Sequence, residues 1–342
     1  NPLFQNNYKI KNQLSIFYEF IGEHEKALKG HNESKKLIEK IFTKNSIQFI
    51  NNLLCIVDLH RKAGKQNLVK ESLNNAMKIA EENFSNNDAL RISILARLST
   101  YYRDTNMYDE CINLRKQIVE LSNKIYGSSH LRVASSWHNF AVALNYKAKI
   151  LKSKKDKIET NRLALKYLLK KNEINQKIYS SDHRSFGPFY TMLGNTYLEL
   201  GEYEKSLIFF EKSLNIRNSV YGENHGMTAF CQIDVADVHM IKKDFESALK
   251  YYNLAYNYFS SKKENNQGWR LFSLAKVISC KYKISNEKDY LDQLENIYQN
   301  HLELSSASTL YVGLLEFLFN ENKRLNNSLK EKYYSEILMD LK

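Results

Sequence analysis

Residues that punctuate β-structure are scarce in this chain. Only two prolines and eleven glycines occur in 342 residues. Strands and the tight turns between them depend on such residues, so a β-sandwich, a β-barrel and a Rossmann fold are excluded. Hydrophobic residues make up 43% and charged residues 26%, so the chain can bury a core and is not a disordered tail. The composition predicts an all-α protein, built as about two domains or as one long repeat array.

Long apolar runs and closely spaced cysteines are also missing. No stretch of 18 or more apolar residues occurs, so we expect no membrane-spanning helix. Cys55, Cys111, Cys231 and Cys280 lie far apart and form no CxxC pair. We therefore expect free buried thiols and a cytoplasmic protein. The sequence starts at Asn1 without a signal segment, and we expect it to be a fragment of a longer protein.

Motifs for catalysis and for cofactors are absent as well. His24 and Glu25 begin an apparent HExxH, but Leu28 stands at its fifth position, so no zinc pair forms. The chain contains no GxxxxGK[ST], no GxGxxG and no GxSxG. We expect no enzymatic activity, no cofactor and no metal.

What the sequence does contain is an internal repeat of 42 residues. One series of turn residues is spaced by this period, with an 11-residue insertion in the fourth unit, and a small residue or a valine follows each member five positions later. A second series ends in His130, His183 and His225, each four residues after a tyrosine that is followed by glycine or, before His183, by serine. We interpret these histidines as structural linkers because they recur with the repeat. The turn series is Gly22, Gly64, Asn106, Glu159, Gly201 and Lys243.

Each unit contains two helical patterns, and their residues resemble the tetratricopeptide repeat. In the fifth unit the signature positions hold Gly194, Tyr197, Tyr203, Ser206, Phe210 and Ser213. In the sixth they hold Ala236, Phe245, Ala248, Tyr252 and Ala255. The 42-residue period and the YG-x-x-H link are similar to the long repeats of kinesin light chains. This resemblance implies helix-turn-helix repeats stacked into a right-handed superhelical solenoid.

The repeat register predicts where the units begin and end. Two helices share each 42-residue unit, so we expect helices of at most about 17 to 20 residues. Unit four departs from the pattern, because Lys171 replaces a usual alanine and the turn carries the insertion. After Asn266 the register slips, and we expect degenerate repeats or capping helices over 266–342. The six predicted repeats are 7–42, 47–84, 89–126, 131–179 with the insertion, 184–221 and 226–261.

The resemblance also implies a binding surface, because the first helices of such pairs line a concave face. The positions expected to point inward are polar in the middle of the array. Asparagines can pair with a peptide backbone and arginines with carboxylates. We expect them to bind a peptide or protein segment, preferably an acidic one, although ordinary solvated helix positions would look the same. The candidates are Arg61, Lys62, Arg97, Arg103, His138, Asn139, Asn145 and Asn195.

A basic patch is the second candidate surface. From Lys147 to Lys177 there are eleven Lys or Arg and three Asp or Glu, a surplus of eight out of the net +12. Such a cluster suits an acidic protein partner or a solvated helix face. We do not expect nucleic-acid binding, because no RRM, KH or OB signature accompanies the charge. The patch is represented by Lys152, Lys154, Lys155, Lys157 and Arg162.

Three functions fit these observations. The first is a non-catalytic protein-interaction module or scaffold. The second is a ligand-sensing regulatory region of a larger signalling or defence protein, whose effector domain lies outside this chain. The third is a stand-alone peptide-pheromone receptor, although no helix-turn-helix output domain is apparent. The sequence leaves the partner and the oligomeric state open.

Overall fold

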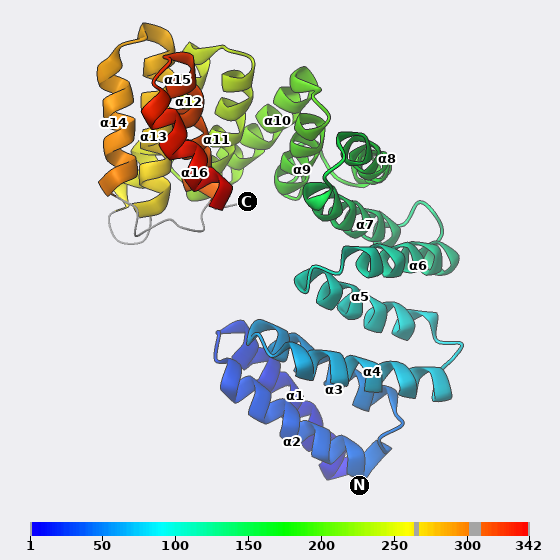
Figure 1. Ribbon diagram of the computed structural model, residues 1–342. Coiled ribbons are helices and arrows are strands. Elements are labelled where there is room, and N and C mark those ends of the chain that lie inside the picture. Colours follow the sequence, from blue (N-terminus) through cyan, green and yellow to red (C-terminus); the bar gives the residue numbers. More distant parts are fainter. Residues whose placement is uncertain (1, 263–266, 301–308, 341–342) are drawn as a thin grey trace. The chain divides into compact units, whose positions relative to one another are not determined.

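The computed structural model describes residues 2–262, 267–300 and 309–340, and these form sixteen α-helices and no strand (Figure 1). The predicted all-α fold is therefore confirmed. Consecutive helices pack as pairs that are joined by short turns, and the chain divides into two compact units, 1–179 and 180–342.

The first unit contains four helix pairs. Its core gathers Ile50, Leu53, Val57 and Leu73 from the second pair with residues of the neighbouring helices. Each pair has one amphipathic helix on either side of a turn, and a single pair could not bury both apolar faces without its neighbours. The helices are α1 (Pro2–Phe20), α2 (His24–Phe42), α3 (Ile47–Lys62), α4 (Gln66–Asn83), α5 (Asp88–Asp104), α6 (Tyr108–Tyr126), α7 (Leu131–Ile150) and α8 (Lys154–Ile178).

The second unit contains four further pairs. Tyr252 and Phe259 are fully buried in one of its cores, and Tyr282 and Tyr298 in another. Residues 301–308, which fall within the C-terminal part expected to hold degenerate repeats or capping helices, lie outside the described chain. The helices are α9 (Phe186–Glu199), α10 (Tyr203–Tyr221), α11 (Gly226–Ile241), α12 (Phe245–Ser261), α13 (Gln267–Ser285), α14 (Lys288–Asn300), α15 (Thr309–Arg324) and α16 (Ser328–Asp340).

The turn inside most pairs uses one residue in the left-handed region. Gly22, Gly64 and Gly201 have φ values of 82°, 71° and 76°, which glycine adopts without steric cost. Asn106 and Lys243 hold the same place with φ of 61° and 65°. The recurring turn residue of the sequence is therefore the residue that reverses the chain.

A small residue or a valine lies five positions after each member of the turn series, and these side chains set how closely the two helices of a pair approach. All six are 0–1% exposed, because the partner helix passes directly over them. A larger side chain at these places would separate the pair. The residues are Ala27, Val69, Cys111, Ala164, Ser206 and Ala248.

The fourth pair corrects two expectations. The insertion does not form a long turn, since only 151–153 separate α7 from α8, and both helices are lengthened instead. Helix α8 has 25 residues, so the expected limit of about 20 was wrong. Glu159 lies inside α8 and is not a turn residue. The inserted residues continue the helical pattern, so extending the helices satisfies their backbone hydrogen bonds without a loop.

The 42-residue register also continues further than expected. Ser273, Val277 and Cys280 in α13 are buried, and each lies 42 residues after a buried residue of α11. The slip occurs at the turn before α14, where Asn286 has φ of 59° and stands 43 residues after Lys243. The division into six repeats and a C-terminal part stays a prediction.

No described helix is both long enough and apolar enough to cross a membrane. The cytoplasmic location expected from the sequence stays a prediction.

Candidate partner-binding face

The arginines predicted to bind a partner lie on neighbouring first helices of the first unit. Arg97 of α5 reaches across to α3, where its Nε lies 2.9 Å from Asp58 Oδ2. Its Nη1 also donates to the carbonyl of Ser93, at 3.3 Å. The Arg97 and Asp58 side chains are 31% and 32% exposed. Such a half-exposed ion pair contributes roughly 0–1 kcal/mol to stability, so its main effect is to hold the guanidinium in place.

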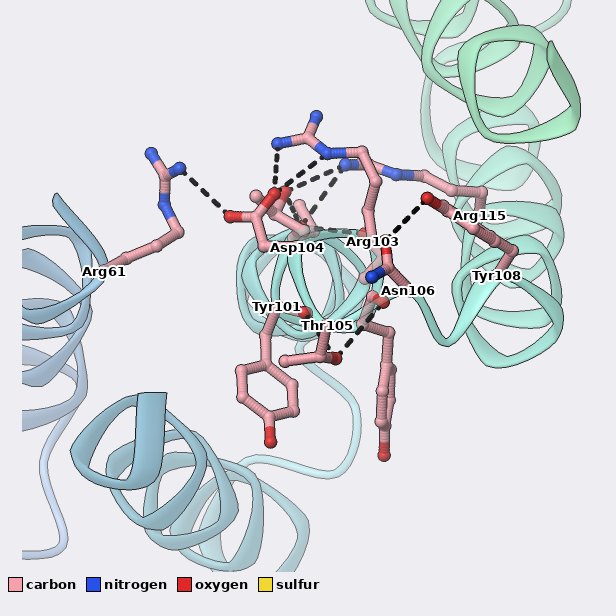
Figure 2. A network of polar contacts seen from close by, with 12 residues as sticks. Arg61, Tyr101, Arg103, Asp104, Thr105, Asn106, Tyr108 and Arg115 are labelled. Carbon is pink, nitrogen blue, oxygen red and sulfur yellow. Dashed lines mark hydrogen bonds and ion pairs between the residues drawn. The ribbon is translucent and has the colours of Figure 1, made fainter. Parts of the chain in front are cut away.

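A second cluster lies at the C-terminal ends of the same two helices (Figure 2). Asp104 stands between two arginines: Arg61 Nη1 of α3 is 3.3 Å from Oδ2, and Arg103 Nη2 is 2.7 Å from Oδ1. Arg103 also donates Nε–H to the same oxygen, at 3.1 Å. One carboxylate therefore orients two guanidinium groups, and the pair of arginines keeps a net positive charge.

Aromatic rings extend this cluster onto α7. The Arg103 guanidinium lies 5.8 Å from the ring centroid of Tyr146, and Tyr146 stacks on Tyr108 with an interplanar angle of 7°. Cation–π contacts of this kind are favourable at exposed sites, by about 0.5–1 kcal/mol. We call the surface of α3, α5 and α7 that carries these residues the first-helix face.

A further arginine, on the second helix α6, contacts the first-helix face through α5. Arg115 of α6 donates from Nη2 to Thr100 Oγ1 at 3.1 Å (Figure 2). Burial lowers the pKa of Arg115 below its usual value. The guanidinium still carries its charge at neutral pH, and it adds positive potential beneath α5.

The other predicted site residues of the first unit differ in accessibility. Lys62 and Asn139 are exposed, whereas His138 and Asn145 are half-buried. Burial, and then the nearby charge of Lys171, lower the pKa of His138 to about 4. Burial alone lowers the pKa of Lys171 to about 8. His138 is therefore neutral at pH 7, and it offers a hydrogen-bonding group and no charge.

Asn195 belongs to the second unit, where it is an exposed residue of α9, and its Nδ2 donates to the carbonyl of Thr191 at 3.0 Å. The candidate residues therefore do not all share one unit, and the first unit holds seven of the eight.

The basic patch lies on the lengthened fourth pair. Lys152 is in the turn, and Lys154, Lys155, Lys157 and Arg162 are on the first half of α8. All but the half-buried Lys157 are exposed. The patch is a solvent-facing helix surface, which leaves both of its sequence interpretations open.

The recurring histidines have structural partners. His130 and His225 precede α7 and α11, and their Nδ1 atoms accept from the amides of Arg132 and Met227 at 3.0 and 3.1 Å. Their rings stack on tyrosines of the preceding helices, with centroids 5.0 and 4.7 Å apart. These contacts cap the first helix of the next pair, as the linker interpretation requires. His183 is placed similarly, with Nδ1 2.7 Å from Ser185 Oγ.

Metal-ligand chemistry finds no support in the described part of the chain. No group of three or more His, Cys, Asp or Glu side chains there could hold a metal ion. The four cysteines are free, three of them buried and Cys55 half-buried. Burial raises the pKa of Cys280 to about 12, so this thiol is not activated as a nucleophile.

Sequence reasoning missed the acidic members of the face, Asp58 and Asp104, and the aromatic Tyr146. A signal for the acidic partners does exist. Asp58 and Arg97 are 39 residues apart, three fewer than one period, and this spacing places them one helical turn apart in register on adjacent first helices. Asp237 and Lys276 repeat it in the second unit, with Nζ 2.7 Å from Oδ1.

Comparisons with known proteins identify the repeat. Residues 189–261 match the sequence model of the tetratricopeptide repeat family. No curated protein matches the chain in sequence.

Solved structures share the fold at low identity. A Podosopora anserina protein described as a kinesin light chain with nearly identical TPR-like repeats has a TM-score of 0.53 and 17% identity, over 63% of this chain and 96% of its own. The apo form of RapI has a TM-score of 0.65 and 13% identity, over 98% and 97%. A Rap protein complexed with competence and sporulation factor has a TM-score of 0.56 and 14% identity, over 98% and 97%.

Residues 189–261 therefore carry the sequence pattern of the tetratricopeptide repeat, and the described helices share the helix-pair fold of the solved structures that match the chain.

Proposed function

We propose that this chain is a non-catalytic interaction module that binds an extended, acidic segment of a protein partner on the first-helix face. The observation that carries the proposal is the arginine cluster at the ends of α3 and α5. Arg61 and Arg103 share the single carboxylate of Asp104 and remain about a third exposed. They are held in position before a ligand arrives, which lowers the entropy lost on binding.

The hydrogen-bonding capacity of the cluster suits carboxylates. A guanidinium has five N–H donors, and Arg61 uses one of them on Asp104. The remaining donors can form a bidentate pair with an incoming Asp or Glu side chain. The ligand competes with Asp104 for Arg61 and Arg103, and with Asp58 for Arg97. We therefore expect moderate affinity and a strong dependence of binding on salt concentration.

Two further features support an extended ligand. Tyr146 offers a ring beside Arg103, against which an apolar side chain of the ligand can pack. Asn139 is exposed on the same helix, and its amide can pair with a peptide backbone. The Rap complex with competence and sporulation factor supports the idea that a helix-pair array of this fold accommodates a ligand.

The test is a pull-down from native lysate with three baits. The first is the native chain, and the second carries Arg61→Glu and Arg103→Glu. The third carries Lys70→Glu and Lys116→Glu, which make the same change in charge at exposed positions of the second helices α4 and α6. Captured proteins are identified by mass spectrometry, and the affinity of each candidate segment is measured by calorimetry.

We expect a partner that is captured by the native and control baits and lost by the arginine variant, with at least a tenfold weaker affinity. Equal capture by all three baits would move the site away from the first-helix face. Loss with the control variant alone would indicate a second-helix surface.

A further inference from the structure

The end of the fourth helix pair is longer than the ends of the pairs before it. One period of 42 residues relates Asp104, the last residue of α5, to Tyr146, but α7 continues for four residues beyond Tyr146. With the eleven inserted residues added, the register would start α8 at Asn161, but it starts seven residues earlier. At 1.5 Å per residue, the two helices are extended by about 6 and 10 Å. We call residues 147–160 the extended tip.

The extended tip is strongly basic. It contains six lysines and two acidic residues, a surplus of four positive charges. Lys147 is paired with Asp109 of α6, with Nζ 2.7 Å from Oδ2. Lys149 and Lys152 are exposed, and in the described part of the chain no carboxylate lies within 4.0 Å of either ammonium group. These two lysines can therefore bind an incoming carboxylate without displacing one that belongs to the chain.

This charge continues the first-helix face. His138, Asn145 and Lys149 are separated by seven and four positions, so they lie on one side of α7. Three residues before Lys149, the ring of Tyr146 lies 5.8 Å from the guanidinium of Arg103. Lys149 is therefore only about 4.5 Å farther along the axis of α7 than the residue that contacts the arginine cluster. The cluster and the extended tip are adjacent parts of one basic surface.

The residues of the extended tip favour an acidic protein segment over a nucleic acid. Sites for single-stranded nucleic acid combine positive charge with aromatic rings on which the bases stack. Residues 147–160 contain no aromatic residue, and Asp156 and Glu159 would repel phosphate groups. Alternate side chains of an extended peptide point the same way and are about 6–7 Å apart. One carboxylate of such a peptide can therefore reach Arg103 while a later one reaches Lys149.

We propose that the extended tip is part of the partner-binding site, where Lys149 and Lys152 bind carboxylates of the same acidic segment that the arginine cluster binds. This inference rests on the proposed function of the first-helix face. Arg61 and Arg103 must exchange Asp104 for the ligand, whereas the described chain places no such competitor at the two lysines. The extended tip therefore contributes more affinity per charge than the cluster, and a partner needs acidic residues beyond those that reach the arginines.

Fluorescence anisotropy with a labelled peptide of about twelve glutamates tests the proposal, because such a peptide spans about 40 Å when extended. A salt concentration of about 50 mM keeps the screening of exposed charges weak. The tip variant carries Lys149→Glu and Lys152→Glu. The matched control carries Lys166→Glu and Lys177→Glu, which make the same change in charge at exposed positions farther along α8. The arginine variant of the pull-down is measured beside them.

We expect the tip variant to bind the peptide at least about fivefold more weakly than the native chain, and the control to change by less than about twofold. Circular dichroism and thermal unfolding check that both variants stay folded. Equal affinities of the tip and control variants would overturn the inference, and a weakened arginine variant would then leave the proposed function standing. Native affinity in the arginine variant would contradict both, as would a native chain that does not bind the peptide.

A single-stranded DNA of about twelve thymidines is the second probe. We expect it to bind the native chain more weakly than the glutamate peptide does, because the extended tip has no ring for base stacking. Tighter binding of the DNA than of the peptide, lost in the tip variant, would assign the extended tip to nucleic acid and overturn the inference.

A deletion of residues 148–158 combined with Glu159→Gly tests the insertion itself. It joins Lys147 to a glycine at the place of the turn residue and restores the regular 42-residue spacing. Both lysines of the proposed site are removed, so we expect this variant to bind the peptide as weakly as the tip variant does. Native affinity in a folded deletion variant would contradict a role of the extended tip in binding.

Discussion

At the scale of single residues, the carboxyl of Asp234 on α11 has a strongly raised pKa. Burial, with a further contribution from Asp237, raises the pKa of Asp234 to about 7, while Arg217 acts in the opposite direction. Asp237 itself is tied to Lys276 and to the hydroxyl of Tyr252. Arg217 is buried and donates to Ser213 and Thr191 Oγ and to the Met227 carbonyl at 3.3–3.4 Å. Ionised Asp234 is therefore only partly compensated.

This carboxyl predicts a pH-dependent stability. Its pKa is higher in the folded state, so the folded state binds the extra proton between about pH 4 and 7, and stability falls as pH rises through that window. Asp234→Asn removes the ionisable carboxyl, and with it the fall in stability at high pH. At pH 8 we expect the variant to be more stable by about 1–2 kcal/mol, and at pH 4 we expect no difference.

Urea unfolding at both pH values measures the effect, with Asp292→Asn on the exposed face of α14 as the control. An equal gain at both pH values would show that the carboxyl does not titrate as described.

The residue scale also shows where sequence reasoning stopped. The register placed Arg61, Arg97 and Arg103 on adjacent first helices, because helical period and repeat length together fix which positions face the same way. It did not pair them with Asp58 and Asp104. Those contacts depend on which of several rotamers a long side chain adopts, and that choice is made by neighbours from another repeat.

At the scale of helices, the closest approach within a pair is at Gly194. A Cβ atom built on this glycine would lie 2.7 Å from Cδ1 and Cε1 of Phe210, and Ser206 Oγ donates to the Gly194 carbonyl at 2.8 Å. The ring of Phe210 is fully buried and cannot move into solvent. Because Gly194 has no side chain, α9 and α10 can pack at this short distance.

Gly194→Leu is therefore expected to lower the free energy of unfolding by about 1–3 kcal/mol or more. Gly268→Ala is the control, since no atom lies within 4 Å of a Cβ atom at that position. A second change, Phe210→Leu, should recover part of the loss by making room. Thermal denaturation of the three variants checks the prediction, and an unchanged midpoint for Gly194→Leu would contradict the repeat register.

Helix lengths could be predicted from the sequence only where the repeat was regular. Turn residues at Gly22, Gly64 and Gly201 mark the chain reversals because glycine tolerates their backbone angles. In the fourth pair the extra residues carry no proline or glycine, so nothing in the pattern separates a long turn from lengthened helices. The helices are lengthened because a continued helix forms its own backbone hydrogen bonds.

At the scale of the whole molecule, the chain consists of two compact units, and each contains one of the two tryptophans. Trp137 is buried in α7 of the first unit, and Trp269 packs against Phe230 and Phe259 in the second. In an array whose repeats contact mainly their neighbours, stability is a sum of local terms. Unfolding is then not strictly all-or-none.

Fluorescence of single-tryptophan variants can follow each unit separately. We expect Gly194→Leu, in the second unit, to shift the urea midpoint reported by Trp269 in a Trp137→Phe background. The midpoint reported by Trp137 in a Trp269→Phe background should move by less than half as much. Equal shifts of both midpoints would show that the two units unfold together.

The left-handed turn residues and the buried positions of the first helices recur every 42 residues in the regular pairs. This period has a consequence for how the gene can change. A deletion or duplication of one whole period joins a second helix to a first helix of the same register, so buried rows meet buried rows again. Loss or gain of any other length rotates the following helices by about 100° per residue and exposes their apolar faces. Such an array changes length most safely in whole steps. The fourth pair, whose eleven extra residues lengthen two helices, shows one way in which an exception can be accommodated.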